Sequence, residues 1–157
     1  MIRMSKQTDY GIVLLTHLAS EPEASHSARE LADVVHLPLP MVSKILKLLA
    51  REGLLVSHRG SSGGYRLARQ PSQITVAEMI NALEGPFAFM ECIETPGTCR
   101  QEAFCRVRSN WYTINTTIVT ALRGITLSDM TRTIPGGMPP PVGGSHRLGG
   151  GQLPVLA

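Results

Sequence analysis

The fold can be predicted from residues 40–68, PMVSKILKLLAREGLLVSHRGSSGGYRLA. In the first part of this stretch, apolar residues recur every three or four positions, which predicts a helix over residues 41–52. In the second part, a glycine-rich turn at residues 59–64 separates two short runs, 54–58 and 65–68, and the helical periodicity is lost. This pattern predicts a β-hairpin that directly follows the helix.

Two further helices are predicted upstream of this stretch. Residues 10–19 are almost wholly apolar, which indicates a buried helix. Ser27-Ala28-Arg29-Glu30 has the form of a capping box, which predicts a second helix over about residues 28–35. Three helices followed by a hairpin define a winged helix–turn–helix, here over residues 1–70, in a mainly α chain.

The second half of the chain is predicted to carry a long helix and a tail. Thr75-Val76-Ala77-Glu78 is another capping box, which opens a short helix. From Pro135 onward, seven glycines and five prolines in 23 residues predict disorder. The predicted divisions are a short helix and cysteine loop (71–106), a dimerisation helix (107–131) and a disordered tail (132–157).

One face of the predicted dimerisation helix carries an apolar stripe, formed by Trp111, Ile114, Ile118 and Leu122. Such a stripe needs to be covered, because large apolar patches are rarely left in water. A second copy of the chain could cover it, or the stripe could pack on its own domain.

Positive charge is concentrated in the predicted winged-helix unit. Residues 44–69 contain six basic residues and one acid, although the net charge of the chain is only +3. Such a local field suits contact with DNA phosphates. An α-helix fits the major groove, and the tip of a hairpin can reach a neighbouring phosphate or the minor groove. The candidate DNA-binding residues are Ser43, Lys44, Lys47, Arg51, Arg59, Gly60, Gly63 and Gly64. The alternatives are a solvated basic face and a helical protein–protein module.

All three cysteines lie in one segment, with the spacing Cys92-x6-Cys99-x5-Cys105. Thiolates bind soft metals, and three within one loop can converge on one centre if the loop wraps it. A zinc ribbon is disfavoured because the segment has no CxxC pair and no histidine nearby. The alternative is three free thiols.

Several classes of function are excluded by what the sequence does not contain. No nucleophile–base motif, nucleotide fingerprint or paired-carboxylate signature is present, so the chain is not predicted to be an enzyme. Aromatic residues make up 4% of the chain, too few for a platform that stacks single-stranded nucleic acid. No apolar run is long enough to span a membrane, and the N-terminus lacks the apolar stretch of a signal peptide, so a cytoplasmic location is expected.

Taken in order, these features resemble the IscR-type family of bacterial winged-helix repressors that sense iron–sulfur status. The resemblance covers roughly residues 1–130, and within the family it is greatest to the regulators of the Suf cluster-assembly operon. It is carried by Ser5–Gly11 (SKQTDYG), the wing motif Arg59-Gly60-x-x-Gly63-Gly64-Tyr65, the three-cysteine loop and Cys105-x4-Asn110-Trp111.

The resemblance implies a homodimer that binds a palindromic operator in double-stranded DNA. It also implies that Cys92, Cys99 and Cys105 hold an iron–sulfur cluster, either 2Fe–2S or 4Fe–4S. In nitric-oxide-sensing relatives an aspartate on the partner's first helix completes the cluster, and Asp9 occupies the matching position here. The other interpretation of Asp9 is a solvated acid or a cap on the first helix.

The sequence departs from the IscR pattern at three places. The first two cysteines are one residue further apart than in the best-known members. Arg108 stands three residues after Cys105, where those members have a histidine ligand. Ser43 replaces the glutamate of their recognition helix, so their operator specificity cannot be transferred to this chain.

The predicted function is therefore a transcriptional regulator that senses cluster status and controls cluster-assembly genes. One alternative is a repressor that responds to redox state or nitric oxide through its thiols, without a structural role for a cluster. Another, of a different class, is a metal carrier or scaffold protein that binds no DNA.

Overall fold

The computed structural model describes residues 4–58, 60 and 63–132. In chain order the elements are α1 (Lys6–Leu18), α2 (Ala28–Val34), α3 (Leu39–Arg51), β1 (Leu55–His58), β2 (Gly64–Leu67), the 3-10 turn η1 (Pro71–Gln73), α4 (Val76–Glu84), α5 (Glu91–Glu94), the 3-10 turn η2 (Glu102–Phe104), α6 (Arg108–Arg123) and α7 (Leu127–Met130). The predicted mainly α fold with a winged helix–turn–helix is confirmed.

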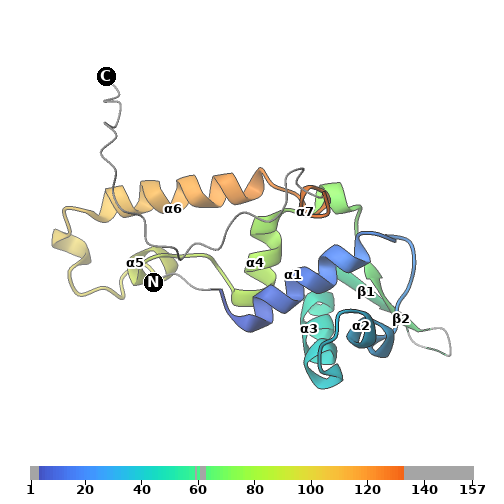
Figure 1. Cartoon of the computed structure of the whole chain (residues 1–157). Coiled ribbons are helices and arrows are strands. Elements are labelled where there is room, and N and C mark those ends of the chain that lie inside the picture. The colour runs from blue at the N-terminus through green and yellow to red at the C-terminus, as the bar shows by residue number, and fades with distance from the viewer. Residues whose placement is uncertain (1–3, 59, 61–62, 133–157) are drawn as a thin grey trace, which may run out of the picture.

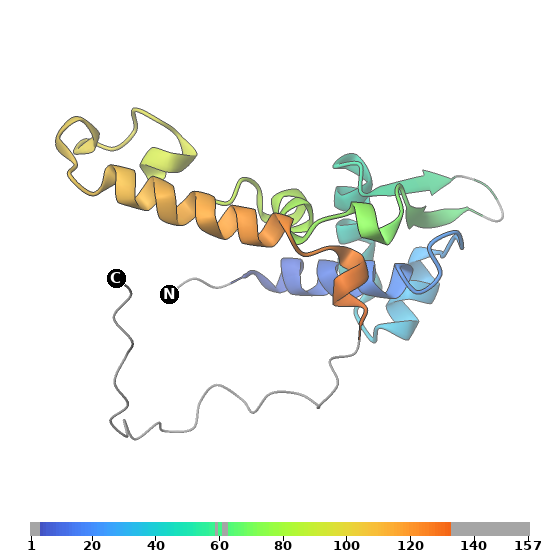
Figure 2. The same cartoon turned by 90° about the horizontal axis from the view of Figure 1, so that it is seen from above.

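The described part of the molecule is elongated (Figures 1 and 2). Helices α1–α3 and the hairpin form one end. Helix α6 runs away from them past α4, and the segment that contains the cysteines lies at its far end. The winged-helix unit and the cysteine segment therefore lie at opposite ends of the described structure.

Side-chain caps fix where several helices begin. Both predicted capping boxes are present, one from Ser27 and Glu30 and the other from Thr75 and Glu78. In each box the hydroxyl accepts from the backbone of the glutamate, and the carboxylate accepts from the backbone of the capping residue. These bonds satisfy amides that have no partner within the helix.

One apolar core joins the winged-helix unit to the elements that follow it. Leu14 of α1, Leu31 of α2 and Leu46 of α3 are wholly buried, as are Met79 of α4 and Leu127 of α7. Each such side chain contributes about 1.5–3 kcal/mol by leaving water. Helix α4 is therefore packed on the same core as α1–α3, and it provides the base from which α6 extends.

The hairpin is anchored to the rest of the unit through its second strand. Strands β1 and β2 pair antiparallel, with Leu55 opposite Leu67 and His58 opposite Gly64. On its other edge, Tyr65 exchanges two backbone hydrogen bonds with His26, of 2.8 and 3.0 Å. A Cβ on Gly64 would lie 2.6 Å from the carbonyl oxygen of His26, so only glycine allows the strand to come this close.

The apolar stripe predicted on α6 is divided between different environments. Leu122 packs against the core of its own chain, whereas Ile114 is 41% exposed. The residue buried on this helix is Asn115, whose side-chain oxygen accepts a hydrogen bond of 3.3 Å from the amide of Phe89. Part of the stripe therefore packs on its own chain, where α6 contacts α4, and the covering of the rest by a second copy stays a prediction.

The predicted cysteine loop, within the division 71–106, contains two short helical turns, α5 and η2. Cys92 lies within α5, and Cys105 directly follows η2. Two predicted features lie outside the described residues: Arg59 at the tip of the wing, and the tail from residue 133 onward.

Candidate DNA-binding surface and cysteine segment

Helix α3 separates apolar and basic side chains onto two faces. Its inner face is wholly buried and consists of Val42, Ile45, Leu46 and Leu49. Its outer face carries the exposed side chains Lys44, Lys47 and Arg51, with Ser43 half-buried beside them. The helix therefore presents a row of cations and a hydroxyl to solvent, as a helix that enters a DNA groove must do.

A tight turn sets the angle between α2 and α3. His36 adopts a left-handed backbone conformation with φ of 53°, and the amide of Leu37 donates to the carbonyl of Ala32 at 3.0 Å. Pro38 is the N-cap of α3, and Pro40 stands in its first turn, where a missing amide proton costs nothing. Two helices joined by such a short turn give the helix–turn–helix geometry.

The wing and α3 together enclose a hollow of about 540 Å³. Lys47 from α3 lines it, together with the wing residues Gly60, Gly63 and Gly64. Four of the eight candidate DNA-binding residues thus meet in one place, although 12 residues separate Lys47 from Gly60 in the sequence. Arg59, the candidate at the tip of the wing, lies outside the described residues.

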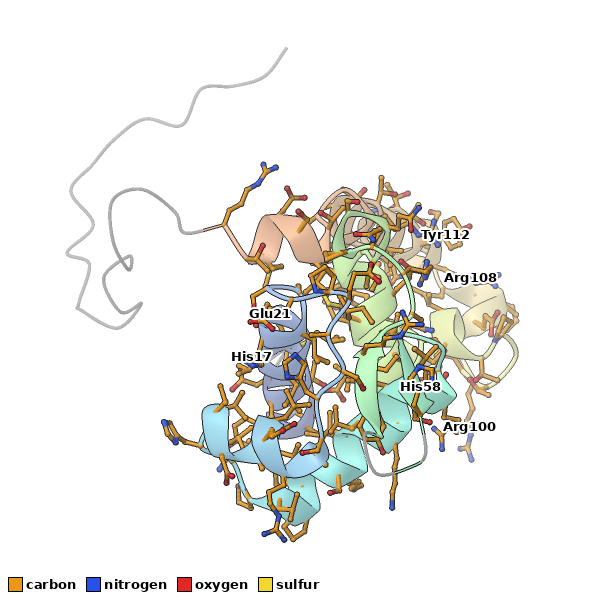
Figure 3. The ribbon with its side chains drawn as sticks, turned by 90° about the vertical axis from the view of Figure 1, so that its right-hand side faces the viewer. His17, Glu21, His58, Arg100, Arg108 and Tyr112 are labelled. Carbon is orange, nitrogen blue, oxygen red and sulfur yellow. The ribbon has the colours of Figure 1, made fainter. Side chains whose placement is uncertain are left out.

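The structure adds His58 to this surface, a residue that the sequence did not single out. His58 lines the hollow and lies at the end of β1 (Figure 3). Its Nε2 accepts a hydrogen bond of 3.3 Å from Nε of Arg66 on the neighbouring strand. The signal that could have found it is its place directly before Arg59, at the strand end that borders the predicted turn.

Arg51 is the candidate in the last turn of α3, and it has a neighbouring acid. Its Nε lies 3.0 Å from Oε1 of Glu52, and the two side chains are 73% and 37% exposed. An ion pair this exposed contributes at most about 1 kcal/mol. The guanidinium of Arg51 therefore remains free to exchange Glu52 for a phosphate.

The three cysteines are free thiols, and each is half-buried. Cys92 and Cys99 line different cavities, of about 430 and 370 Å³. Among the described residues, no three His, Cys, Asp or Glu side chains lie close enough together to hold a metal ion. The segment therefore supplies the thiols that soft metals prefer, but this conformation keeps their sulfur atoms apart.

Asp9, the fourth candidate ligand, is exposed in the first turn of α1. It is not part of any such metal-holding group within its own described chain. The start of α1 is held by Glu84 at the end of α4, which accepts from the hydroxyl of Thr8 and from the amide of Ser5. These hydrogen bonds, that of Thr8 first, lower the pKa of Glu84 below its usual value.

A basic recognition helix and a wing that share one hollow define a winged-helix DNA-binding transcriptional regulator. Comparison with known proteins agrees with this class. The chain belongs to the Rrf2 family, described as iron-dependent transcriptional regulators, whose sequence model matches residues 4–133.

Three relatives illustrate the range of this similarity. The structure of CymR, the global cysteine regulator of B. subtilis, is 27% identical with a TM-score of 0.65, and the match covers 83% of this chain and 97% of CymR. The structure of T. potens IscR is 31% identical with a TM-score of 0.62, over 82% of this chain and 85% of IscR. The HTH-type transcriptional regulator NsrR of Shouchella clausii is 26% identical, over 82% of this chain and 88% of NsrR.

These relatives are transcriptional regulators rather than enzymes, in agreement with the prediction from the sequence. The predicted resemblance to IscR-type regulators is also confirmed. In the part of the chain that the structure describes, every helix is too short or too polar to cross a bilayer.

Proposed function

We propose that this chain is a homodimeric regulator that senses iron–sulfur status through its cysteine segment and controls cluster-assembly genes of the Suf type. The observation that carries the proposal is the presence of three half-buried free thiols within one segment of a winged-helix regulator. The family's description as iron-dependent regulators supports it. So does the resemblance to Suf regulators over the wing and around Cys105.

The DNA-binding role follows from the surface at the other end of the molecule. Helix α3 enters the major groove with Ser43, Lys44, Lys47 and Arg51 facing outward. The glycines of the wing let its backbone approach the phosphates closely, and Arg59 at the tip reaches the neighbouring groove or a phosphate. Two such units in a dimer read the two halves of a palindromic operator.

The donor chemistry of Cys92, Cys99 and Cys105 suits an iron–sulfur cluster, because iron in such clusters is held by thiolates. The positions of the three sulfur atoms in this conformation do not suit it, so the segment has to rearrange before they converge. When bound, a cluster supplies redox and exchange chemistry that thiols alone lack. Asp9 of the partner subunit is the candidate for the remaining ligand.

A dimer is supported by the apolar side chains that α6 and the segment before it leave exposed. Phe104 is 84% exposed, Tyr112 65% and Val107 50%. Apolar groups gathered along one part of a surface indicate a contact with another chain. Sedimentation of the purified protein measures the mass directly, and a monomer at micromolar concentration would contradict this part of the proposal.

A second candidate function is a thiol-based redox regulator on the same DNA-binding scaffold. The observation that favours it is that the thiols are free and apart in the described conformation. A cluster absorbs broadly in the visible and near-ultraviolet range, whereas thiols and disulfides do not. An anaerobic spectrum, with iron and sulfide counts per chain, therefore separates the two candidates, and the counts distinguish 2Fe–2S from 4Fe–4S.

Replacing the cysteines tests which residues hold the cluster. Cys92→Ala, Cys99→Ala and Cys105→Ala should each abolish stable cluster binding, because two thiolates cannot retain the cluster against solvent. The fold should survive in all three variants, since the segment lies outside the apolar core. Far-ultraviolet circular dichroism checks the fold, and iron counts check the cluster. A triple variant that remains coloured and iron-replete would refute the assignment.

A metal carrier that binds no DNA is distinguished by titration with duplex DNA. A regulator with this basic surface should bind duplex DNA with an affinity that falls steeply as salt rises, because bound phosphates release counterions. A carrier should show no binding at low salt.

A further inference from the structure

The carboxylate of Glu102 connects three parts of the cysteine segment. It accepts a hydrogen bond of 2.6 Å from the amide of Gly97, in the turn before Cys99. Its other oxygen lies 2.7 Å from Nη2 of Arg108, the first residue of α6. The side chain of Glu102 is 15% exposed, so this ion pair is better shielded from water than the other ion pairs of the described chain.

Arg108 lies between the cysteines. It lines the cavity of Cys92 and also the cavity of Cys99. Its amide donates to the carbonyl of Cys105 at 3.5 Å. Arg108 therefore forms a wall that the two cavities share, and it stands beside Tyr112 at the start of α6 (Figure 3).

The turn that Glu102 holds has a conformation that needs glycine. Gly97 has φ of 89°, in the left-handed region that other residues rarely adopt. The bond from its amide to Glu102 fixes this turn relative to η2, and the pair with Arg108 fixes η2 relative to α6. Both contacts belong to the conformation in which Cys92 and Cys99 line two different cavities beside Arg108.

We propose that Arg108 is a positioning residue whose ion pair with Glu102 holds the cysteine segment in a cluster-free conformation. This ion pair, here called the latch, must break before the three thiols can converge. This inference rests on the proposed function, since it concerns how the segment becomes ready for a cluster. The pair is suited to the task because the side chain of Arg108 is 50% exposed, so water can compete for it and the latch can open.

The test compares the uptake of a cluster by three variants and the wild-type chain under anaerobic conditions, with ferrous iron and sulfide as the probe. Arg108→Gln removes the charge that holds Glu102, and Arg108→Lys keeps it. Arg106→Gln is the matched control, because it removes the same charge from an exposed arginine that forms no ion pair with a described residue. The readouts are the rate at which visible absorbance grows and the amide hydrogen exchange of residues 97–106 in the cluster-free protein.

We expect Arg108→Gln to take up the cluster about two- to fivefold faster than wild type, the range for breaking one half-exposed ion pair. Amide exchange in the segment should accelerate by a similar factor. Arg108→Lys and Arg106→Gln should stay close to wild type in both measurements, with unchanged iron and sulfide counts.

The latch is refuted if Arg108→Gln and Arg106→Gln behave alike, or if Arg108→Gln slows uptake, since the arginine would then assist the bound state. If the wild-type chain takes up no cluster, the proposed function fails. The exchange measurement then still decides on the latch itself: faster exchange in Arg108→Gln alone supports it, and equal exchange refutes it.

Discussion

Lys47 is the residue at which the two parts of the candidate DNA-binding surface, α3 and the wing, meet. It projects from the outer face of α3, and it lines the hollow whose other side is the wing. Its helical neighbours Ile45 and Leu46 are wholly buried, so the backbone at this position is held by the core. A compact ammonium group held in this place suits contact with a phosphate rather than reading of a base.

Lys47→Ala should therefore weaken binding to all duplex sequences by a similar factor. The slope of log affinity against log salt should fall by about one, because one fewer counterion is released. Titration of fluorescent duplexes at several salt concentrations measures both quantities. Lys6→Ala removes the same charge from α1 and should leave both unchanged. Equal behaviour of the two variants would count against the DNA-binding surface.

Arg59 should behave differently because it lies at the wing tip predicted by the sequence. Arg59→Ala should cost about 1–3 kcal/mol on the operator, as expected for an arginine that reads a groove. On unrelated DNA the loss should be smaller. Competition between operator and random duplexes measures the difference, and an unchanged operator affinity would remove Arg59 from the interface.

At the scale of elements, the contact between α1 and α4 fixes the position of the first turn of α1. Glu84, the last residue of α4, accepts hydrogen bonds from the amide of Ser5 and the hydroxyl of Thr8. The hydrogen bonds from these residues lower the pKa of Glu84. A lowered pKa in the folded state means that ionised Glu84 stabilises the fold above the pKa of the unfolded chain. This contribution to stability is lost as pH falls through the pKa that Glu84 has in the folded state.

Glu84→Gln should thus destabilise the protein at pH 7 by a small amount, about 0.5 kcal/mol, since the contact is exposed to solvent. The difference from wild type should shrink as pH falls through the lowered pKa that Glu84 has in the folded state, and it should vanish once the carboxyl is protonated in both states. Urea unfolding at pH 7 and at a series of acidic pH values measures this. Glu21→Gln, at an exposed glutamate that forms no side-chain hydrogen bond with a described residue, should show no such dependence.

The elements that could be predicted from the sequence are those with local signals. The boxes at Ser27 and Thr75 are complete within four residues, so α2 and α4 were placed correctly. The burial of Asn115 on α6 was not predicted, because its hydrogen-bond partner, the amide of Phe89, lies 26 residues away in the sequence. The contact between Glu102 and Arg108 likewise depends on how the segment folds back, and no periodicity in the sequence reveals it.

At the scale of the whole molecule, the winged-helix unit and the cysteine segment lie at opposite ends of one chain (Figures 1 and 2). Within one chain, a structural change at the cysteines therefore has to be transmitted along the length of the molecule to alter the winged-helix unit. In a dimer the two sites are closer if the cysteine segment of one subunit contacts α1 of the other, since α1 packs directly on the candidate recognition helix α3. The state of the cluster would then alter the relative position of the two DNA-binding units.

Asp9 tests this path because it is an exposed carboxylate in the first turn of α1. If it completes the cluster across the dimer, Asp9→Ala should still assemble a cluster on the three thiols. That cluster should be lost severalfold faster in air, and the difference in operator affinity between loaded and cluster-free protein should shrink. Decay of visible absorbance and DNA titration of both forms measure the two effects. Asp33→Ala removes another exposed acid, from α2, and should change neither. Wild-type values in Asp9→Ala would mean that water or a small thiol occupies the fourth position, and that the coupling between the cluster and DNA follows another contact.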